Sequence, residues 1–222
     1  MVEFFNETGS SQLEIVASRS KFFLSTLPKE DFPVMASEEY DFDFTIKSKL
    51  IRRLFDKSKF AMSSEETRYY LNGVYLHPCI ENEKNILRAV ATDGHRLAQI
   101  DIENPGIKEN FSGIIVPKKT VSELRMVLEN ENDDISISIS NNKIRFSNNF
   151  LTLTSKIVDG TFPDYKRVIP LENDKKLQVN ANEFSEAVDR VSTVSSERSR
   201  AVKLSLSSGR LHLSVNSPEN GK

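Results

Sequence analysis

The sequence feature that most constrains the fold is an order of expected strands and helices that recurs about every 65–70 residues. Residues 44–55 predict a short strand that runs into an amphipathic helix, because apolar residues there are spaced i, i+4. Expected strands at 68–76 and 86–91 follow it. A strand–helix–strand–strand unit that recurs along a chain is typical of an architecture of repeated supersecondary units.

A second copy of the unit begins at Gly113. It has an expected strand at 114–116, a helix after Pro117, and strands at 135–139, 143–147 and 150–156. The two residues Asn141 and Asn142 favour a hairpin turn between two of these strands. A third copy begins near residue 177, with a strand around Val179, a helix over 184–191, and a hairpin of 202–206 with 211–215.

Two such units placed back to back predict an α+β domain, with two helices on one side of antiparallel sheets. The chain ends do not match a whole unit. Residues 1–36 offer only strands at 12–17 and 21–26, and the sequence stops just after a hairpin. Uncovered sheets are poor end points for a domain. We therefore expect a fragment, with the remnant of one domain at 1–36, a complete domain at 37–170 and a truncated one at 171–222.

Composition excludes several classes of protein. The 30 lysines and arginines balance 32 acidic residues, whereas a conventional DNA-binding domain is strongly basic. Weak, non-specific contact through a locally basic face is still allowed. The single cysteine, Cys79, fits a reducing compartment. The absence of a signal peptide pattern and of a long apolar run predicts a cytoplasmic protein without membrane contact.

Five short stretches, in a fixed order, carry a resemblance to a known family. They are FFLSTLPKEDFP at 22–33, RYYLNG at 68–73, ATDGHRLA at 91–98, SKIVDG at 155–160 and FPDYKRVIP at 162–170. Each resembles the corresponding segment of the bacterial sliding clamps, the β subunits of DNA polymerase III.

The resemblance implies the DNA clamp fold, with antiparallel sheets outside and two helices per domain inside. It implies a DNA replication protein of three similar domains that pairs head to tail as a homodimer and closes a ring around double-stranded DNA. Such a processivity factor is a non-catalytic subunit of a DNA-directed DNA polymerase (a transferase, specifically a nucleotidyltransferase), without cofactors. Its partners would be the polymerase α subunit, the clamp loader, and other clamp-binding polymerases and repair proteins.

The resemblance also implies a pocket between domains two and three that binds a partner peptide rich in Gln, Leu and Phe. The matching positions in this chain are Leu71, Thr92, Gly94, His95, Arg96, Leu97, Pro163, Arg167 and Val168. Their chemistry suits the task, because the apolar members can form a floor, Gly94 allows close backbone approach and the arginines can reach carboxylates. The alternative is that residues 92–94 form only a tight turn.

A second candidate surface would face DNA without reading its sequence. The expected helix at 47–59 carries six basic residues against one acid, and the helix at 118–129 opens with two lysines where the helix dipole disfavours cations. An arginine and two tyrosines follow the polar loop 63–67, where the family contacts DNA. The expected DNA-binding residues are Arg52, Arg53, Arg68, Tyr69, Tyr70, Lys118 and Lys119. The alternative is a solvated helix face, with one tyrosine of a strand packed in the core.

Two rival functions stay open. Asp93 and His95 could form a catalytic acid–base pair, which would require a deep cleft and perturbed titration. A scaffold protein without DNA contact would point its basic residues to different faces. For a metal, His77 and Cys79 supply at most two of the four ligands that zinc needs, so no metal site is expected.

Overall fold

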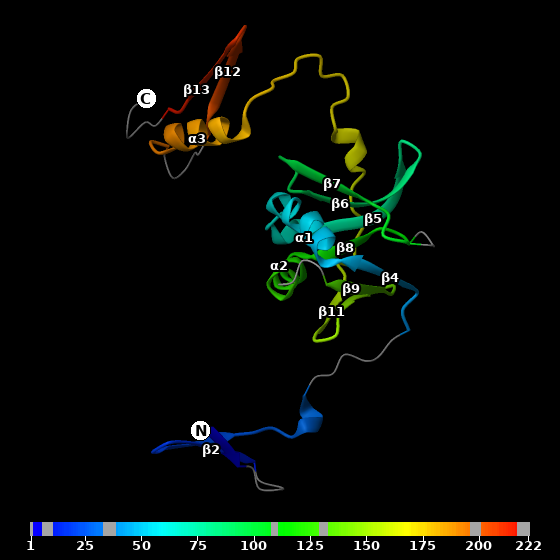
Figure 1. Ribbon diagram of the computed structural model, residues 1–222, viewed down its shortest axis with the longest axis vertical. Helices are drawn as coiled ribbons and strands as arrows, with labels where there is room; N and C mark the ends of the chain where they lie inside the picture. The colour runs from blue at the N-terminus through cyan, green and yellow to red at the C-terminus, as the bar shows by residue number, and fades with distance from the viewer. Residues whose placement is uncertain are drawn as a thin grey trace. The chain divides into compact units, whose positions relative to one another are not determined.

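The computed structural model describes residues 2–5, 11–32, 39–107, 111–128, 133–195 and 201–216. The chain divides into two units, Met1–Pro163 and Asp164–Lys222. In the first unit, residues 39–163 form two four-stranded antiparallel sheets and two helices (Figure 1). Three strands near the N-terminus, β1 (Val2–Phe5), β2 (Gln12–Ala17) and β3 (Ser20–Ser25), form a separate sheet.

The central region repeats one order of elements twice. The first copy consists of β4 (Phe42–Lys47), α1 (Ser48–Asp56), β5 (Gly73–Glu81), β6 (Lys84–Thr92) and β7 (Leu97–Glu103). The second consists of β8 (Ile114–Pro117), α2 (Lys118–Val127), β9 (Asp134–Ile139), β10 (Lys143–Ser147) and β11 (Thr152–Lys156). The expected repeat is thus present, with one strand more per copy than the four-element unit.

The sheet topology exchanges the first strand of each copy. One sheet has the order β7-β6-β5-β8 and the other the order β11-β10-β9-β4. Each copy therefore lends its opening strand to the sheet of the other copy. Because all pairs are antiparallel and the two sheets hold each other's strands, the two copies form a single folding unit.

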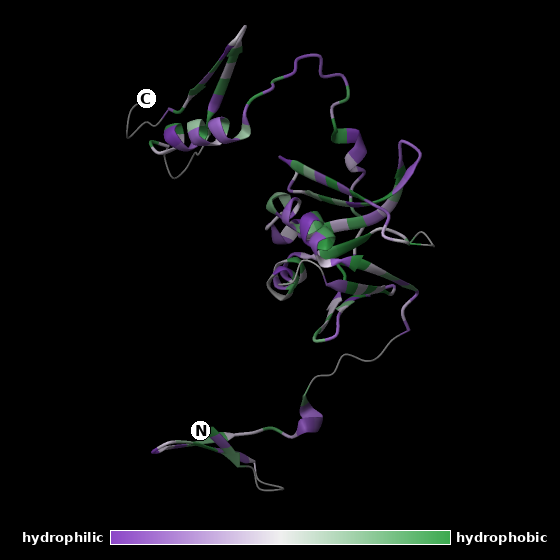
Figure 2. Ribbon diagram, in the orientation of Figure 1, coloured by the Kyte–Doolittle hydropathy of each residue, from purple (hydrophilic) through white to green (hydrophobic). Residues whose placement is uncertain are grey.

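One hydrophobic core lies between the helices and the sheets. α1 contacts β4, β6 and β7, whereas α2 contacts β5 and β8. The apolar stripe of α1 is fully buried at Ile51 and Leu54, and that of α2 at Val121 and Leu124. Figure 2 shows hydrophilic residues on the same helices, which is the amphipathic pattern that predicted them. The two helices also contact each other, and Arg125 Nε lies 3.2 Å from Asp56 Oδ1 across their interface.

The second unit contains one helix and one hairpin. α3 (Ala181–Ser192) begins at Asn180, whose side chain accepts hydrogen bonds from the N–H groups of Asn182 and Glu183. The strands β12 (Lys203–Ser207) and β13 (Arg210–Ser214) pair antiparallel, and α3 contacts β13. The helix and hairpin expectations are confirmed. The strand expected around Val179 is wrong, because residues 171–180 adopt no regular structure.

Three 3-10 helices complete the central region and the start of the second unit: η2 (Lys59–Ala61), η3 (Glu66–Leu71) and η4 (Tyr165–Val168). A fourth, η1 (Lys29–Asp31), follows the N-terminal sheet. The strand expected at 68–76 is wrong in its first half, because η3 occupies it and β5 begins only at Gly73. The tyrosines in this stretch therefore do not alternate between two faces of a sheet.

Candidate functional site

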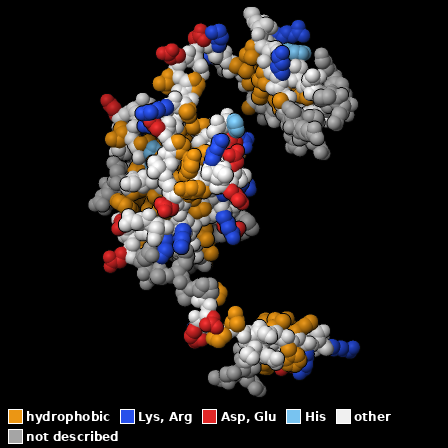
Figure 3. All heavy atoms as spheres, turned by 180° about the vertical axis from the view of Figure 1, so that it is seen from behind, with side chains coloured by type: hydrophobic (Ala, Val, Ile, Leu, Met, Phe, Trp, Pro, Cys, Tyr) orange, Lys and Arg blue, Asp and Glu red, His pale blue; other side chains and the backbone are white. Residues whose placement is uncertain are grey.

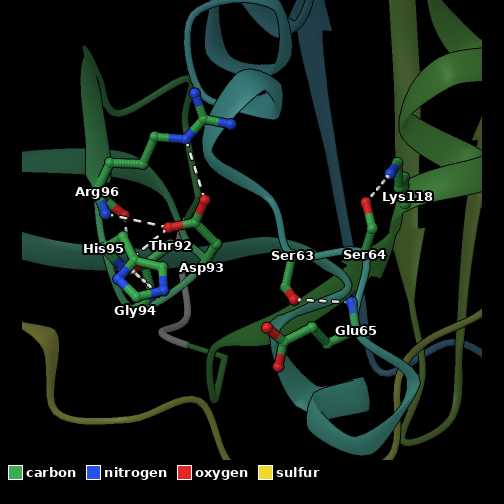
Figure 4. A network of polar contacts seen from close by, with 9 residues as sticks. All are labelled: Ser63, Ser64, Glu65, Thr92, Asp93, Gly94, His95, Arg96 and Lys118. Carbon is green, nitrogen blue, oxygen red and sulfur yellow. Dashed lines mark hydrogen bonds and ion pairs between the residues drawn. The ribbon is translucent and has the colours of Figure 1, made fainter. Parts of the chain in front are cut away.

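The connection between β6 and β7, which we call the 92–96 turn, is held by its own side chains (Figure 4). The Thr92 hydroxyl donates to the carbonyl oxygen of Arg96 at 2.7 Å and accepts from the Gly94 N–H at 3.1 Å. The Asp93 carboxylate accepts from the N–H groups of His95 and Arg96, both at 3.0 Å. Gly94 has φ +89°, a conformation that other residues rarely adopt. The turn is therefore preorganised.

The Asp93 carboxylate also holds the side chain of Arg96, whose Nε lies 3.0 Å from Oδ2. The hydrogen bond from the His95 N–H, helped by those from Arg96 and opposed by desolvation, lowers the pKa of Asp93. A carboxylate with a lowered pKa is a weaker base. Asp93 and His95 also lie on a surface turn, and within the described residues the hydrogen bonds of Asp93 run to main-chain groups and Arg96. The geometry therefore contradicts the catalytic-pair hypothesis.

We expect Asp93→Asn to destabilise the turn at neutral pH but not in acid. Because the pKa is lower in the folded chain than its usual value of 3.8, ionised Asp93 contributes stability above that value. This contribution is lost as the pH falls through the lowered pKa. The unfolding free energies of wild type and variant, measured between pH 7 and pH 2.5, should converge below pH 3.8. A difference that is constant over this range would contradict the role assigned to the carboxylate.

Residues 59–71 lie against the 92–96 turn. η2 contacts β6 and β7, and the guanidinium carbon of Arg96 lies 5.7 Å from the centre of the Phe60 ring. On the other side, a Cβ atom added to Gly94 would lie 3.1 Å from Nη1 of Arg68. Arg68 also pairs with Glu65, with Nε 3.3 Å from Oε2. The turn is thus flanked by an aromatic ring and a second cation.

The structure brings together most of the expected docking residues of the first unit. Gly94, His95 and Arg96 are exposed, and Leu97 is half-buried at the start of β7. Thr92 and Leu71 are buried, with Leu71 only 5% exposed. Such a buried side chain can offer a ligand no more than its edge, so Leu71 supports the surface from below.

Pro163 ends the first unit and follows a segment that is fixed to the sheet. The Phe162 ring stacks on Tyr75 at 4.8 Å between ring centres with an interplanar angle of 4°, and the Val158 N–H donates to Ile115 O at 2.9 Å. Arg167 and Val168 lie in η4 of the second unit, where both are exposed and Arg167 pairs with Asp164. Their joining the 92–96 turn stays a prediction.

Sequence reasoning missed Phe60, whose side chain is 56% exposed beside Arg96. One signal was available. The buried stripe of α1 continues to Ser58, which is fully buried and donates to Leu54 O at 2.7 Å. Phe60 lies off this stripe, and an aromatic residue off the apolar stripe is a candidate for contact with a partner.

Among the expected DNA-binding residues, Tyr69 and Tyr70 form an edge-to-face pair with ring centres 5.7 Å apart. A Cβ atom added to Gly160 would lie 3.1 Å from Cβ of Tyr70 and 3.3 Å from Cε2 of Tyr69, so both tyrosines rest against the backbone there. Tyr69 is 54% exposed. It leaves an aromatic face available to a ligand.

The basic residues of the two helices are mostly at the surface. Arg53, Lys118 and Lys119 are exposed and Arg52 is half-buried. Lys118 Nζ donates to Ser64 Oγ at 2.7 Å, which ties the start of α2 to the polar loop before η3 (Figure 4). In the view of Figure 3, basic and acidic side chains are interspersed over the central region. The gathering of these four residues on one face stays a prediction.

Within the described ranges, no three His, Cys, Asp or Glu side chains are grouped so as to hold a metal ion. His77 and Cys79 lie two residues apart on β5, and the His77 ring stacks on Tyr75 at 4.7 Å. In the same part of the chain, no helix has the length and apolar character to cross a membrane.

Comparisons with known proteins agree on one family. Residues 45–164 match the model of the DNA polymerase III beta subunit, central domain, and residues 166–222 match that of its C-terminal domain. The beta sliding clamp of Caulobacter vibrioides is 46% identical over 95% of this chain, and that of Escherichia coli is 38% identical over 91%. The chain spans 57% of the first relative and 54% of the second.

Solved structures show the same relationship. The sliding clamp of Bartonella birtlesii is 49% identical, with a TM-score of 0.90 over 96% of this chain and 57% of that one. The DNA polymerase III subunit beta of Pseudomonas aeruginosa is 37% identical, with a TM-score of 0.88 over 99% of this chain and 59% of that one. The repeated strand–helix units with antiparallel sheets are thus the clamp fold, and this chain belongs to the family of DNA polymerase III β subunits, the bacterial β sliding clamps.

Proposed function

We propose that this chain belongs to a DNA sliding clamp, a non-catalytic processivity factor of the bacterial replicative DNA polymerase that acts in the cytoplasm. In this proposal the whole protein encircles double-stranded DNA as a homodimeric ring. It docks the polymerase α subunit, the clamp loader, and other polymerases and repair proteins through one peptide-binding pocket. The observation that carries the docking proposal is the preorganised 92–96 turn in a chain of this family.

A closed ring would act by confinement. A polymerase tethered to a ring that cannot leave the duplex stays at high effective concentration near its template. The charge balance of the chain, 30 basic against 32 acidic residues, suits this role because contacts with phosphate stay weak enough for sliding. Contacts to phosphates carry no sequence information, so the clamp would move without preferred positions.

For the pocket we propose the nine residues named from the family resemblance. The 92–96 turn would offer the exposed backbone at Gly94, while Arg96 would bind a peptide carboxylate or carbonyl. Two relatives bear on this proposal. The Bartonella clamp was solved bound to griselimycin, and a Caulobacter crescentus clamp carries a polyethylene glycol at its putative beta-motif tethering region.

For DNA we propose a surface on the helices and the polar loop, formed by Arg52, Arg53, Arg68, Tyr69, Tyr70, Lys118 and Lys119. The exposed ring of Tyr69 and the exposed lysines at the start of α2 support it. We further propose that residues 1–36, 37–170 and 171–222 correspond to the end of domain one, domain two and part of domain three.

Titration of this chain with a labelled peptide of the type Gln-Leu-x-Leu-Phe tests the docking proposal. Fluorescence anisotropy should show saturable binding, and the double variant His95→Ala, Arg96→Ala should weaken it by more than about tenfold, because it removes the exposed side chains of the turn. The matched control is Arg210→Ala, His212→Ala, which removes the same two residue types from β13.

Binding that survives the His95→Ala, Arg96→Ala change, or that the β13 control abolishes equally, would place docking elsewhere. Absence of saturable binding would show that this chain does not dock such a peptide. Neither outcome would alter the family assignment, which rests on sequence and fold.

A further inference from the structure

We propose that Phe60 is an additional peptide-contacting residue, and that it receives a large apolar side chain next to an acidic group of the docked partner. This inference rests on the proposed docking function and extends it beyond the nine residues of the pocket. Its basis is the position of Phe60 beside the 92–96 turn.

The exposure of Phe60 stands out against its neighbours. Ser58 and Ala61 are fully buried and Met62 is 7% exposed, whereas 56% of Phe60 faces solvent. The Ser58 hydroxyl fixes the segment to the end of α1, and η2 lies against β6 and β7. The ring is therefore displayed from a backbone that the core holds in place. A rigid exposed aromatic ring loses little conformational entropy on binding, which favours it as a contact residue.

Arg96 makes this ring part of the turn surface. Its guanidinium carbon lies 5.7 Å from the ring centre, while Nε is bound to Asp93 at 3.0 Å. A cation over an aromatic face is attracted by the ring quadrupole. The Arg96 side chain, still 59% exposed, is thereby oriented from two sides and keeps donors available to a ligand.

The occupant follows from this arrangement. An aromatic face beside a half-exposed guanidinium is complementary to an apolar side chain that is followed or preceded by a carboxylate. On the far side of Gly94, Arg68 supplies a second cation and so extends the same preference for negative charge. We infer a peptide with an acidic residue adjacent to its apolar anchor.

The experiment is the same peptide titration, made with an Asp placed beside the apolar anchor and with its Asn counterpart. Phe60→Ala should weaken binding of the Asp peptide about fivefold, because it removes one exposed aromatic contact. Phe60→Leu, which keeps an apolar surface, should stay within about twofold of wild type. The matched control is Phe150→Ala, which removes a ring that is 90% exposed at the β10–β11 turn.

Equal affinity of Phe60→Ala and wild type would overturn the proposal. So would equal weakening by Phe60→Leu and Phe60→Ala, because Phe60 would then act only by orienting Arg96, and so would equal affinity for the Asp and Asn peptides. Failure of the parent docking proposal is recognised separately, since binding would then also survive the His95→Ala, Arg96→Ala change. Thermal melts of each variant confirm that it is folded.

Discussion

Gly73→Ala is expected to lower the free energy of unfolding of the central region by about 3 kcal/mol. Gly73 opens β5 and pairs with Pro117 of β8. A Cβ atom there would lie 2.4 Å from Val116 O and 2.9 Å from Cγ2 of Ile115. The first of these is a backbone atom of a buried strand, so no side-chain rotation relieves the overlap. β8 would have to move away from β5 at the point where α2 begins.

Denaturant unfolding of this chain, followed by circular dichroism, measures the effect. The matched control is Gly106→Ala, where φ is +98° but no atom lies within 4 Å of the added Cβ. That control is expected to cost only about 1 kcal/mol, from backbone strain without overlap. Equal destabilisation by the two variants would mean that β8 accommodates the methyl group and that the close approach of β5 and β8 is not essential.

Arg88→Met is expected to destabilise the chain by about 3 kcal/mol at pH 7, since removing one partner of a buried pair leaves the other charge uncompensated. Arg88 is 3% exposed in the middle of β6. Its Nε and Nη2 each lie 2.7 Å from a carboxylate oxygen of Asp101 on β7, and Nη2 lies 3.0 Å from Glu81 on β5. One guanidinium therefore links three adjacent strands.

A double-mutant cycle isolates this linkage. Arg88→Met combined with Asp101→Leu should be more stable than Arg88→Met alone, because no unpaired carboxylate is left beside the apolar side chain. The unfolding free energies of the two single variants and the double variant give the coupling directly. Strictly additive effects would show that Arg88 stabilises the sheet through its methylene groups and not through the ion pair.

Local patterns predicted most of the regular elements. The i, i+4 spacing of Leu50 with Leu54 and of Ile51 with Phe55 predicted α1, and the Asn141-Asn142 turn predicted the β9–β10 hairpin. Both signals lie within a few residues, so they act wherever the segment folds. The failure at 68–71 has a local cause too. Alternating large side chains there indicated a strand, but the chain forms the 3-10 helix η3, in which Leu71 turns into the core.

The 92–96 turn was also readable in part. Thr, Asp and Gly in succession are turn-forming residues whose side chains bond to nearby backbone groups, and the structure has these bonds. Phe60 and Arg68 could not be placed beside this turn, because they lie in a different segment of the sequence. Only the packing of η2 and η3 beside the turn brings their side chains to Arg96 and Gly94.

By itself, the sequence determined the repeated order of elements, the buried faces of the helices and the family to which the chain belongs. Tertiary structure alone decided that the two copies exchange their first strands, so that Ile46 pairs with Ile135 and Leu76 with Ile114. The reason is physical. Helical and hairpin signals are local, whereas pairing between distant strands uses main-chain groups that are the same in every residue. The choice of partner strand is made by the packing of the whole core.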